Sequence, residues 1–326
     1  MRKVYKVTLK ALSPIFIGSG ETLRKSQYLF NKNTQQATII KEDALVQALI
    51  KYGKLKAFIE IIKTSNVPLV RILKELGITQ HQYLEHYTLK INGFANTDRE
   101  QLNDLNTIIR DGTGSVYIPG SSIKGALRTC LLKNMGVSNI DFNKLSISDS
   151  SVVPNSQLAI YQKVDFSKKL GTLRVYRECI APGTEVTFNI TLIDSAIDID
   201  SLLDSIQYTY ETYHNGWATP LINAREQDLN KYDFFDNYHN PKDVKEDDRF
   251  IMYLGGGAGF VSKTLHYKTK NRDTAKYDVF KILKNNFSIY RKFKGVPNHV
   301  PMALKLAKNN HKLMEMGKCE LFFDEI

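Results

Sequence analysis

The spacing of apolar residues changes period several times along this chain of 326 residues. From Lys3 to Ser13 apolar and polar positions alternate, which predicts a strand with one buried face. From Lys41 to Lys63 the apolar positions recur at helical spacing, and a second helix is predicted from Pro68 to Leu76. A third helix is predicted to begin at the capping-box pattern Thr97–Glu100 and to end near Gly112. We therefore expect a mostly helical block, at about residues 41–110, inside a frame of strands.

Short strands and turns dominate the rest of the pattern. The β-rich runs Leu173–Ile180 and Val186–Ile193 are separated by Ala181–Thr184, whose Pro-Gly pair predicts a hairpin. The charged run Asp236–Arg249 is typical of a mobile surface loop. Further strands are predicted at Leu29-Phe30, Ala37–Ile40, Phe250–Leu254 and Lys318–Phe323, and an amphipathic helix at Ile199–His214. Because the order of strand, glycine turn, helix and hairpin recurs loosely after about Asp194, we predict an α+β fold with two similar halves.

The stretch SVYIPGSSIKGALRTCLL, residues 115–132, joins a bend to the start of a helix, and we call it the elbow. Pro119 pre-sets the turn, and Gly120 allows the backbone to approach a neighbour closely. Ser121 or Ser122 stands where a hydroxyl can cap the helix. The free N–H groups of such a helix start favour an anion, although an ordinary capped helix explains the same residues.

The helix of the elbow has a predicted buried stripe and a basic flank. Lys124 and Arg128 are four residues apart, so both can reach one phosphate backbone. Lys124 precedes Gly125, so the phosphate-binding pattern GxxxxGK[ST] does not match. The predicted buried stripe consists of Ile123, Ala126, Leu127, Cys130 and Leu131.

A second stretch of small residues, YLGGGAGFVSKT, follows a predicted strand, and we call it the late glycine loop. The dinucleotide-binding pattern GxGxxG fails, because Phe260 occupies its last glycine position. Five small residues are more than a tight turn needs, which favours a loop that faces a ligand, but a tight turn stays the alternative. Its glycines are Gly255, Gly256, Gly257 and Gly259, and Lys263 follows them.

Composition narrows the class of protein. Hydrophobic residues make up 42% and charged residues 24% of the chain, which indicates a folded, soluble protein. No apolar run approaches the roughly 20 residues that a membrane span needs. The cysteines Cys130, Cys179 and Cys319 lie far apart, which favours the cytoplasm and free thiols. The seven histidines form no zinc-binding pattern, so neither a metal nor another cofactor is expected.

Charge is unevenly distributed around a net value of +11. Residues 1–63 contain twelve Lys/Arg and four Asp/Glu, and residues 251–319 contain fourteen and three. Residues 194–249 contain instead thirteen Asp/Glu and five Lys/Arg. This segregation predicts a basic surface for a polyanion and an acidic surface that faces elsewhere. The aromatic residues Tyr208, Tyr210, Tyr213 and Trp217 could stack on bases or pack in the core.

Three segments together resemble a known family. They are LSPIFIGSGE near the start, YIPGSSIKGALRTCLL in the middle and LGGGAGFVSKT late in the chain. In this order they resemble the RAMP superfamily of CRISPR proteins, and most of all the fifth Csm subunits of type III-A effector complexes. The resemblance implies tandem ferredoxin-like (RRM-like) domains that grip guide RNA by its backbone. We expect an N-terminal RAMP domain at 1–193, with the helical insertion inside it, and a C-terminal RAMP-like domain at 194–326.

The resemblance also implies a set of RNA-binding residues and partners. The expected function is that of a non-catalytic subunit that binds guide RNA (crRNA), caps the 3′-end side of the complex and supports guide maturation and antiviral defence. The implied partners are guide RNA, target RNA by proximity, the repeated backbone subunits and a recruited host nuclease, without a membrane. The implied RNA-binding residues are Gly18 and Gly20 in the first glycine loop; Gly120, Ser121, Ser122, Lys124 and Arg128 in the elbow; and Gly255, Gly256, Gly257, Gly259 and Lys263 in the late glycine loop.

One departure from the superfamily bears on chemistry. Its target-cutting subunits carry an aspartate shortly after the first glycine loop, whereas residues 22–41 of this chain contain no carboxylate. Without a base or a metal ligand there, cleavage of a target is not expected. The alternative is a metal-independent endoribonuclease that trims the guide with His81, His86 or His214 as its base. A plain adaptor without RNA contact is the third possibility.

Overall fold

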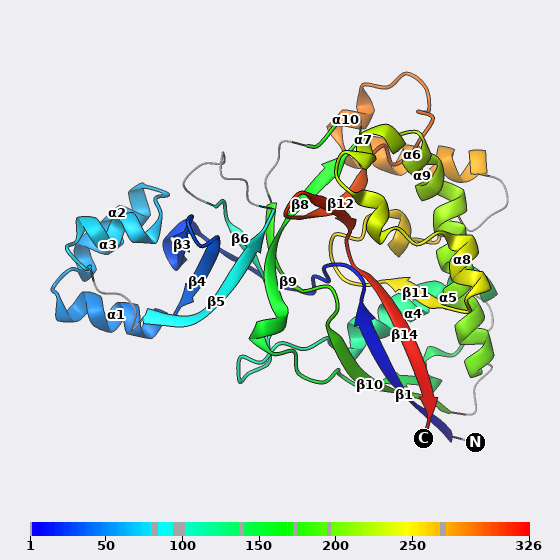
Figure 1. Cartoon of the computed structure of the whole chain (residues 1–326), viewed down its shortest axis with the longest axis horizontal. Coiled ribbons are helices and arrows are strands. Elements are labelled where there is room, and N and C mark those ends of the chain that lie inside the picture. Colours follow the sequence, from blue (N-terminus) through cyan, green and yellow to red (C-terminus); the bar gives the residue numbers. More distant parts are fainter. Residues whose placement is uncertain are drawn as a thin grey trace.

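Two sheets form the frame of the molecule, with helices packed on them and a smaller helical lobe to one side (Figure 1). The computed structural model describes residues 2–79, 84–93, 102–136, 140–167, 169–171, 175–193, 197–267 and 272–326. No helix in these ranges is long and apolar enough to cross a membrane. The predicted α+β class is confirmed, because helices and curled sheets alternate along the described chain.

The first sheet has the strand order β11-β14-β1-β10-β7. The chain visits it in the order β1, α4, β7, β10, α5 and β11, which is the order of a ferredoxin-like fold, and β14 is inserted between β11 and β1. All four strand pairs are antiparallel. The elements are β1 (Arg2–Ala11), α4 (Gly120–Met135), β7 (Leu145–Ile147), β10 (Glu185–Ile193), α5 (Ile199–Tyr213), β11 (Phe250–Tyr253) and β14 (Lys318–Glu325).

The alternation in β1 determines which of its faces meets the helices. Val7 and Leu9 are buried in one core cluster with Leu127 of α4 and Ile206 of α5. The residues of β1 that alternate with them are more exposed. The predicted first strand and the predicted amphipathic helix at residues 199–214 are therefore confirmed. Alternation was a reliable guide here because β1 has one face on the core and one toward solvent.

The second sheet has the strand order β2-β6-β9-β8-β5-β4-β3, and the hairpin of β12 and β13 extends it at β8. β5 runs beside β4 over most of its length but reaches β8 only through Ile91 and Asn92. β5 thus connects the lobe to the main body (Figure 1). The strands are β2 (Gly18–Leu23), β3 (Tyr28–Asn31), β4 (Gln36–Ile40), β5 (Glu85–Asn92), β6 (Leu105–Ile108), β8 (Leu158–Phe166), β9 (Val175–Ile180), β12 (Leu304–Asn309) and β13 (Lys312–Glu315).

The lobe consists of β3, β4 and three short helices with their own apolar core (Figure 1). The helices are α1 (Glu42–Lys51), α2 (Leu55–Thr64) and α3 (Leu69–Glu75). One helix was predicted for residues 41–63, and this is wrong at Gly53, whose φ of +65° ends α1. Lys54 N–H then donates to the carbonyl of Leu49, and the chain starts α2 in a new direction.

Two further predictions fail because distant pairing overrides local patterns. The predicted third helix includes residues 105–108, but these form β6 between β2 and β9; its start at Thr97–Glu100 lies outside the described residues. The predicted hairpin at 173–193 is also wrong, because β9 and β10 belong to different sheets. The turn Ala181–Thr184 instead leads from one sheet to the other, and Gly183 N–H donates to the carbonyl of Ala11.

A second helical layer covers the remaining core. The charged run Asp236–Arg249 is not a loop, because it contains α8, and Pro241 and Val244 of that helix are buried. The tyrosines and the tryptophan of residues 210–217 lie mainly in this core rather than on a surface. The elements of this layer are the π-helix His214–Ala218, α6 (Thr219–Asn223), α7 (Glu226–Asn230), α8 (Pro241–Glu246), α9 (Arg272–Asn286), α10 (Ser288–Arg291), η6 (Phe234–Asn237) and η7 (Val261–Lys263). Three further 3₁₀ turns lie elsewhere: η1 (Lys25–Gln27) beside α3 in the lobe, η3 (Phe142–Lys144) and η4 (Asn155–Gln157).

Both sheets combine strands from either side of residue 193. β11 and β14 flank β1 in the first sheet, and β12 pairs with β8 in the second. The division into domains at residues 1–193 and 194–326 stays a prediction about folding units.

Candidate nucleic-acid interface

The start of α4 is packed against the chain rather than left open. A Cβ on Gly120 would lie 2.4 Å from the carbonyl oxygen of Ile147, so only glycine fits between α4 and the segment after β7. Gly120 N–H donates to Oδ1 of Asp149 at 2.7 Å. The expectation of a free donor at Gly120 is therefore wrong, since a carboxylate of the protein already occupies it.

The serines of the elbow do not cap the helix. Pro119 is the N-cap residue, and no side chain caps the helix from that position. Ser121 is exposed and Ser122 is half-buried, so both hydroxyls remain near the surface. The predicted capping role is wrong because the carboxylate of Asp149, 29 residues later in the chain, takes that place.

The two sides of α4 agree with the pattern in the sequence. The predicted stripe is buried at Ile123, Leu127, Cys130 and Leu131, and half-buried at Ala126. On the flank Lys124 is half-buried and Arg128 is exposed. The guanidinium of Arg128 lies 4.9 Å from the centre of the Phe142 ring, which holds this cation at the surface.

The far end of α4 contacts the late glycine loop. Lys133 is buried, and its Nζ donates to the carbonyl of Val261 at 3.3 Å. Burial lowers the pKa of Lys133 to about 8. The start of α4 at Gly120 thus lies about 20 Å from this contact, at 1.5 Å per helical residue, and α4 connects the two regions.

The structure brings the first and late glycine loops together at Phe16. Gly256 N–H donates to the carbonyl of Phe16 at 2.6 Å. A Cβ on Gly255 would lie 2.3 Å from the same oxygen. Gly18 and Gly20 follow at the exposed start of β2. The two predicted loops therefore form one surface, whereas the bend at Pro119 and Gly120 lies at the opposite end of α4.

Sequence reasoning missed the residue at the centre of this surface, Arg177 of β9. Its guanidinium lies 4.7 Å from the centre of the Phe16 ring, and its Nη1 would be 2.6 Å from a Cβ on Gly257. Nε and Nη1 of Arg177 are buried and have no hydrogen-bond partner among the described residues. Burial lowers its pKa. Two buried, unpaired nitrogens on a half-buried arginine beside a glycine loop are well suited to receive an anion.

Further cations surround Arg177. Lys163 of β8 and Lys305 of β12 both contact Asp165, at 2.5 and 2.8 Å. The pKa of Lys163 is lowered by burial, and the charges of Lys305 and Arg177 add to this effect. Lys263, after the late glycine loop, is exposed, and its pKa is lowered by burial of its charged end and by Arg177. We call the set Lys163, Asp165, Arg177, Lys263 and Lys305 the basic sheet face.

The nearby Arg110 differs because its guanidinium is paired with a carboxylate, although its Nε, like that of Arg177, has no hydrogen-bond partner among the described residues. Arg110 is paired with the buried carboxylate of Glu178, and its guanidinium lies 4.2 Å from the centre of the Tyr87 ring. Glu178 also accepts a hydrogen bond from Ile108 N–H at 3.1 Å. This ion pair fastens β6 to β9, so Arg110 has a structural role.

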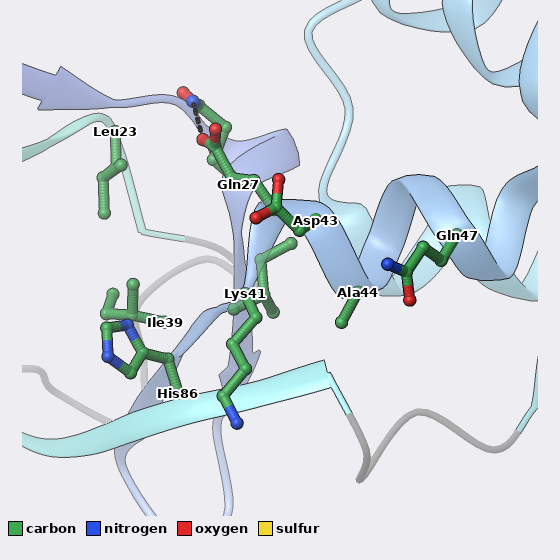
Figure 2. A pocket seen from close by; sticks show the side chains of 10 residues that line it. Leu23, Gln27, Ile39, Lys41, Asp43, Ala44, Gln47 and His86 are labelled. Carbon is green, nitrogen blue, oxygen red and sulfur yellow. Dashed lines mark hydrogen bonds between the residues drawn. The ribbon is translucent and has the colours of Figure 1, made fainter.

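The histidines proposed as bases are placed differently by the structure. His214 is completely buried, its Nε2 lies 3.1 Å from the hydroxyl of Tyr253, and burial lowers its pKa to about 4. His214 therefore belongs to the core and cannot reach a phosphodiester from there. His86 is exposed at a hollow of the lobe, with Lys41, Asp43 and Gln47 around it (Figure 2). His81 lies outside the described residues, and among the described residues no group of side chains could hold a metal ion.

Comparison with known proteins places the chain in a family. The RAMP superfamily profile matches residues 8–310. The chain is 35% identical, over 100% of its length and 99% of the relative's, to the CRISPR system Cms protein Csm5 of Enterococcus italicus. It is 26% identical to the protein of the same name from Streptococcus thermophilus, over 99% and 98%.

Solved structures share the fold at 17% identity. One belongs to a Csm–crRNA–target RNA ternary complex of a type III-A CRISPR-Cas system, with a TM-score of 0.74 over 98% of this chain and 100% of that one. The other is T. onnurineus Csm5, with a TM-score of 0.65 over 96% and 99%. This chain belongs to the RAMP superfamily and, within it, to the family of Csm5 proteins. The resemblance found in the three sequence segments is thereby confirmed.

Proposed function

We propose that this chain is a non-catalytic, guide-RNA-binding subunit that caps the 3′-end side of a type III-A CRISPR (Csm) effector complex. In this role it supports guide maturation and antiviral defence in the cytoplasm. Its partners are guide RNA, the repeated backbone subunits and, by proximity, target RNA, and any trimming of the guide comes from a recruited nuclease. The names of the full-length relatives support the assignment to such a complex.

The observation that carries the RNA-binding part is that Nε and Nη1 of Arg177 are buried without a hydrogen-bond partner among the described residues. Leaving charged donors of a half-buried arginine without acceptors is costly, so such a group is retained where a ligand supplies the acceptors. A phosphate at Arg177 would meet Lys163, Lys263 and Lys305 nearby, and glycines leave room for the strand. The contacts would be to the backbone, so binding is independent of sequence.

The proposed contact set keeps the residues inferred from the sequence and adds the basic sheet face. Gly18, Gly20, Gly257, Gly259 and Lys263 lie along the joined loops, where a backbone can pass closely. In the elbow Lys124 and Arg128 offer charge from a flank. Gly120, Ser121, Ser122, Gly255 and Gly256 complete the set of proposed contact residues.

Binding of a fluorescent guide-like RNA to the purified protein tests the proposal. We expect affinity to fall steeply as salt rises, because phosphate contacts release counterions. The RNA should stay intact with EDTA, with Mg²⁺ and with Mn²⁺. Binding that does not depend on salt would contradict the RNA-binding role. Cleavage that His86→Ala or His81→Ala abolishes would establish the endoribonuclease instead.

A further inference from the structure

A surface outside the proposed contact set combines exposed aromatic rings with positive charge. Between Val279 and Met314 the chain has eight Lys/Arg and no Asp/Glu. Within this run, residues 287–294 read FSIYRKFK, with apolar and basic side chains interleaved. Phe287, Ile289 and Phe293 are 53%, 56% and 36% exposed. We call residues 287–294, which include α10, the α10 ridge.

Hydrogen bonds and ring contacts hold the ridge in place, so its exposed rings have fixed positions on the surface. Tyr290 is its buried anchor: its hydroxyl accepts from Met302 N–H at 3.0 Å, and its ring meets that of Phe280 edge-on. Phe287 N–H donates to the carbonyl of Leu283 at 2.8 Å. Arg291 donates to the last carbonyls of α9, including that of Asn285 at 3.0 Å.

Arg291 is therefore occupied by the protein itself, while two other cations of the ridge are free to act outward. Lys292 and Lys294 are exposed on either side of Phe293. Phe293 thus lies between two exposed lysines, and Phe287 is exposed at the start of the same short segment. A protein-binding hot spot is usually depleted of lysine, whereas a single-stranded nucleic acid needs both a stacking surface and positive charge.

The ridge also lies next to the basic sheet face. Tyr290 contacts Met302, which comes two residues before β12 and three before Lys305. The charge of Asp165 contributes to the raised pKa of Tyr290, after burial, which places the anchor near that carboxylate. Figure 1 shows α10 beyond the ends of β8 and β12.

We propose that the α10 ridge stacks bases of a single-stranded RNA as the strand leaves the basic sheet face. The proposal rests on the RNA-binding function above and extends its footprint. Phe287 and Phe293 supply rings that any base can stack on, and Lys292 and Lys294 neutralise the phosphates between those bases. The ridge therefore adds affinity only for a strand long enough to reach it.

The test compares two RNAs, of about 8 and about 30 nucleotides, on the full-length protein at fixed salt. The Phe287→Ala/Phe293→Ala variant should bind the long RNA about tenfold more weakly and the short RNA about as wild type does. A long RNA without bases in one half should lose the same factor on the wild-type protein. Ile50→Ala/Tyr52→Ala is the matched control, because these residues are exposed on the lobe, and it should change neither affinity.

The possible outcomes separate the ridge from the proposed function. If the folded double variant binds the long RNA like wild type, the ridge does not stack bases. If it then also fails to join Csm subunits, the ridge is a protein contact and the proposal is overturned. If wild type binds neither RNA in a salt-dependent manner, the proposed function itself fails.

Discussion

The elbow and the basic sheet face both combine glycine with cations, but they use them differently. In the elbow, Gly120 packs against the backbone after β7, and Asp149 accepts its N–H, so the donor is satisfied inside the molecule. In the basic sheet face, two buried nitrogens of Arg177 lack acceptors among the described residues. A conspicuous sequence motif can thus serve mainly to build the fold, while an inconspicuous arginine keeps capacity for a ligand.

The largest expected effect is on the fold at the elbow. Gly120→Ala places a methyl group 2.4 Å from the carbonyl oxygen of Ile147, which the backbone can relieve only by moving. We expect a loss of about 3 kcal/mol in the free energy of unfolding, measured by urea titration. Gly125→Ala is the control, because its Cβ meets nothing within 4 Å in the same helix. The free energy of unfolding of Gly125→Ala should rise by about 1 kcal/mol. Equal losses in the two variants would refute the packing role of Gly120.

The buried Lys133, which links α4 to the late glycine loop, is expected to change stability with pH. Because burial lowers its pKa to about 8, the folded protein binds fewer protons than the unfolded chain, where a lysine titrates near about 10.4. Its contribution to stability therefore rises with pH from about 8 to about 10.4 and is least favourable below that window. Lys133→Met should be more stable than wild type at pH 7 by about 2 kcal/mol, an advantage that shrinks toward pH 10. A pH-independent difference in urea unfolding would contradict the lowered pKa.

The next effect concerns the affinity of the basic sheet face. Arg177→Ala should weaken binding of guide-like RNA about tenfold, since a charge-assisted contact is worth about 1.5–3 kcal/mol. Its free energy of unfolding should change by less than about 1 kcal/mol, because Nε and Nη1 make no hydrogen bond that the substitution would remove.

For Arg110→Ala we expect the opposite result: a loss of stability without a loss of RNA affinity. Its removal leaves Glu178 buried without its ion pair, so we expect a loss of stability of about 3 kcal/mol. The affinity of the folded fraction should be unchanged. If Arg110→Ala and Arg177→Ala weakened binding equally, the contrast between occupied and unoccupied guanidinium groups would be wrong.

The smallest effect is expected at the flank of the elbow. Lys124→Ala/Arg128→Ala should reduce the salt slope of RNA binding by about two contacts and weaken all sequences alike. Arg128 already lies against Phe142, so its removal costs little beyond this charge. An unchanged slope in the folded double variant would leave the elbow without RNA contact.

The sequence could predict features that depend on local pattern. The buried stripe of α4 and the alternation of β1 follow from periodicity alone, and both appear in the structure. The three glycine-containing segments also sufficed to identify the superfamily. Where a turn or a capping box was the only signal, as at Ala181–Thr184 and for the helix predicted across residues 105–108, the assignment failed, because partners far away in the chain decide the pairing.

The basic sheet face could not be predicted for the same reason. Lys305 lies opposite Asp165 only because β12 pairs with β8 in one particular register, across about 140 residues. Arg177 lies near Lys305 and Asp165 because β9 pairs with β8 on the edge opposite to β12. In the sequence, Arg177 is followed directly by Glu178 in a β-rich run, and nothing there indicates that Glu178 pairs with Arg110 while two nitrogens of Arg177 lack a partner.

The central claim is that RNA lies mainly on the joined glycine loops and the basic sheet face, while the start of α4 makes fewer of the contacts. Photo-crosslinking of the full-length protein to a 4-thiouridine-labelled guide-like RNA, followed by peptide mass spectrometry, tests it most directly. We predict adducts in the peptides that contain Phe16, Arg177 and the late glycine loop, and few in the peptide with Gly120. Adducts confined to residues 119–128 would contradict the account.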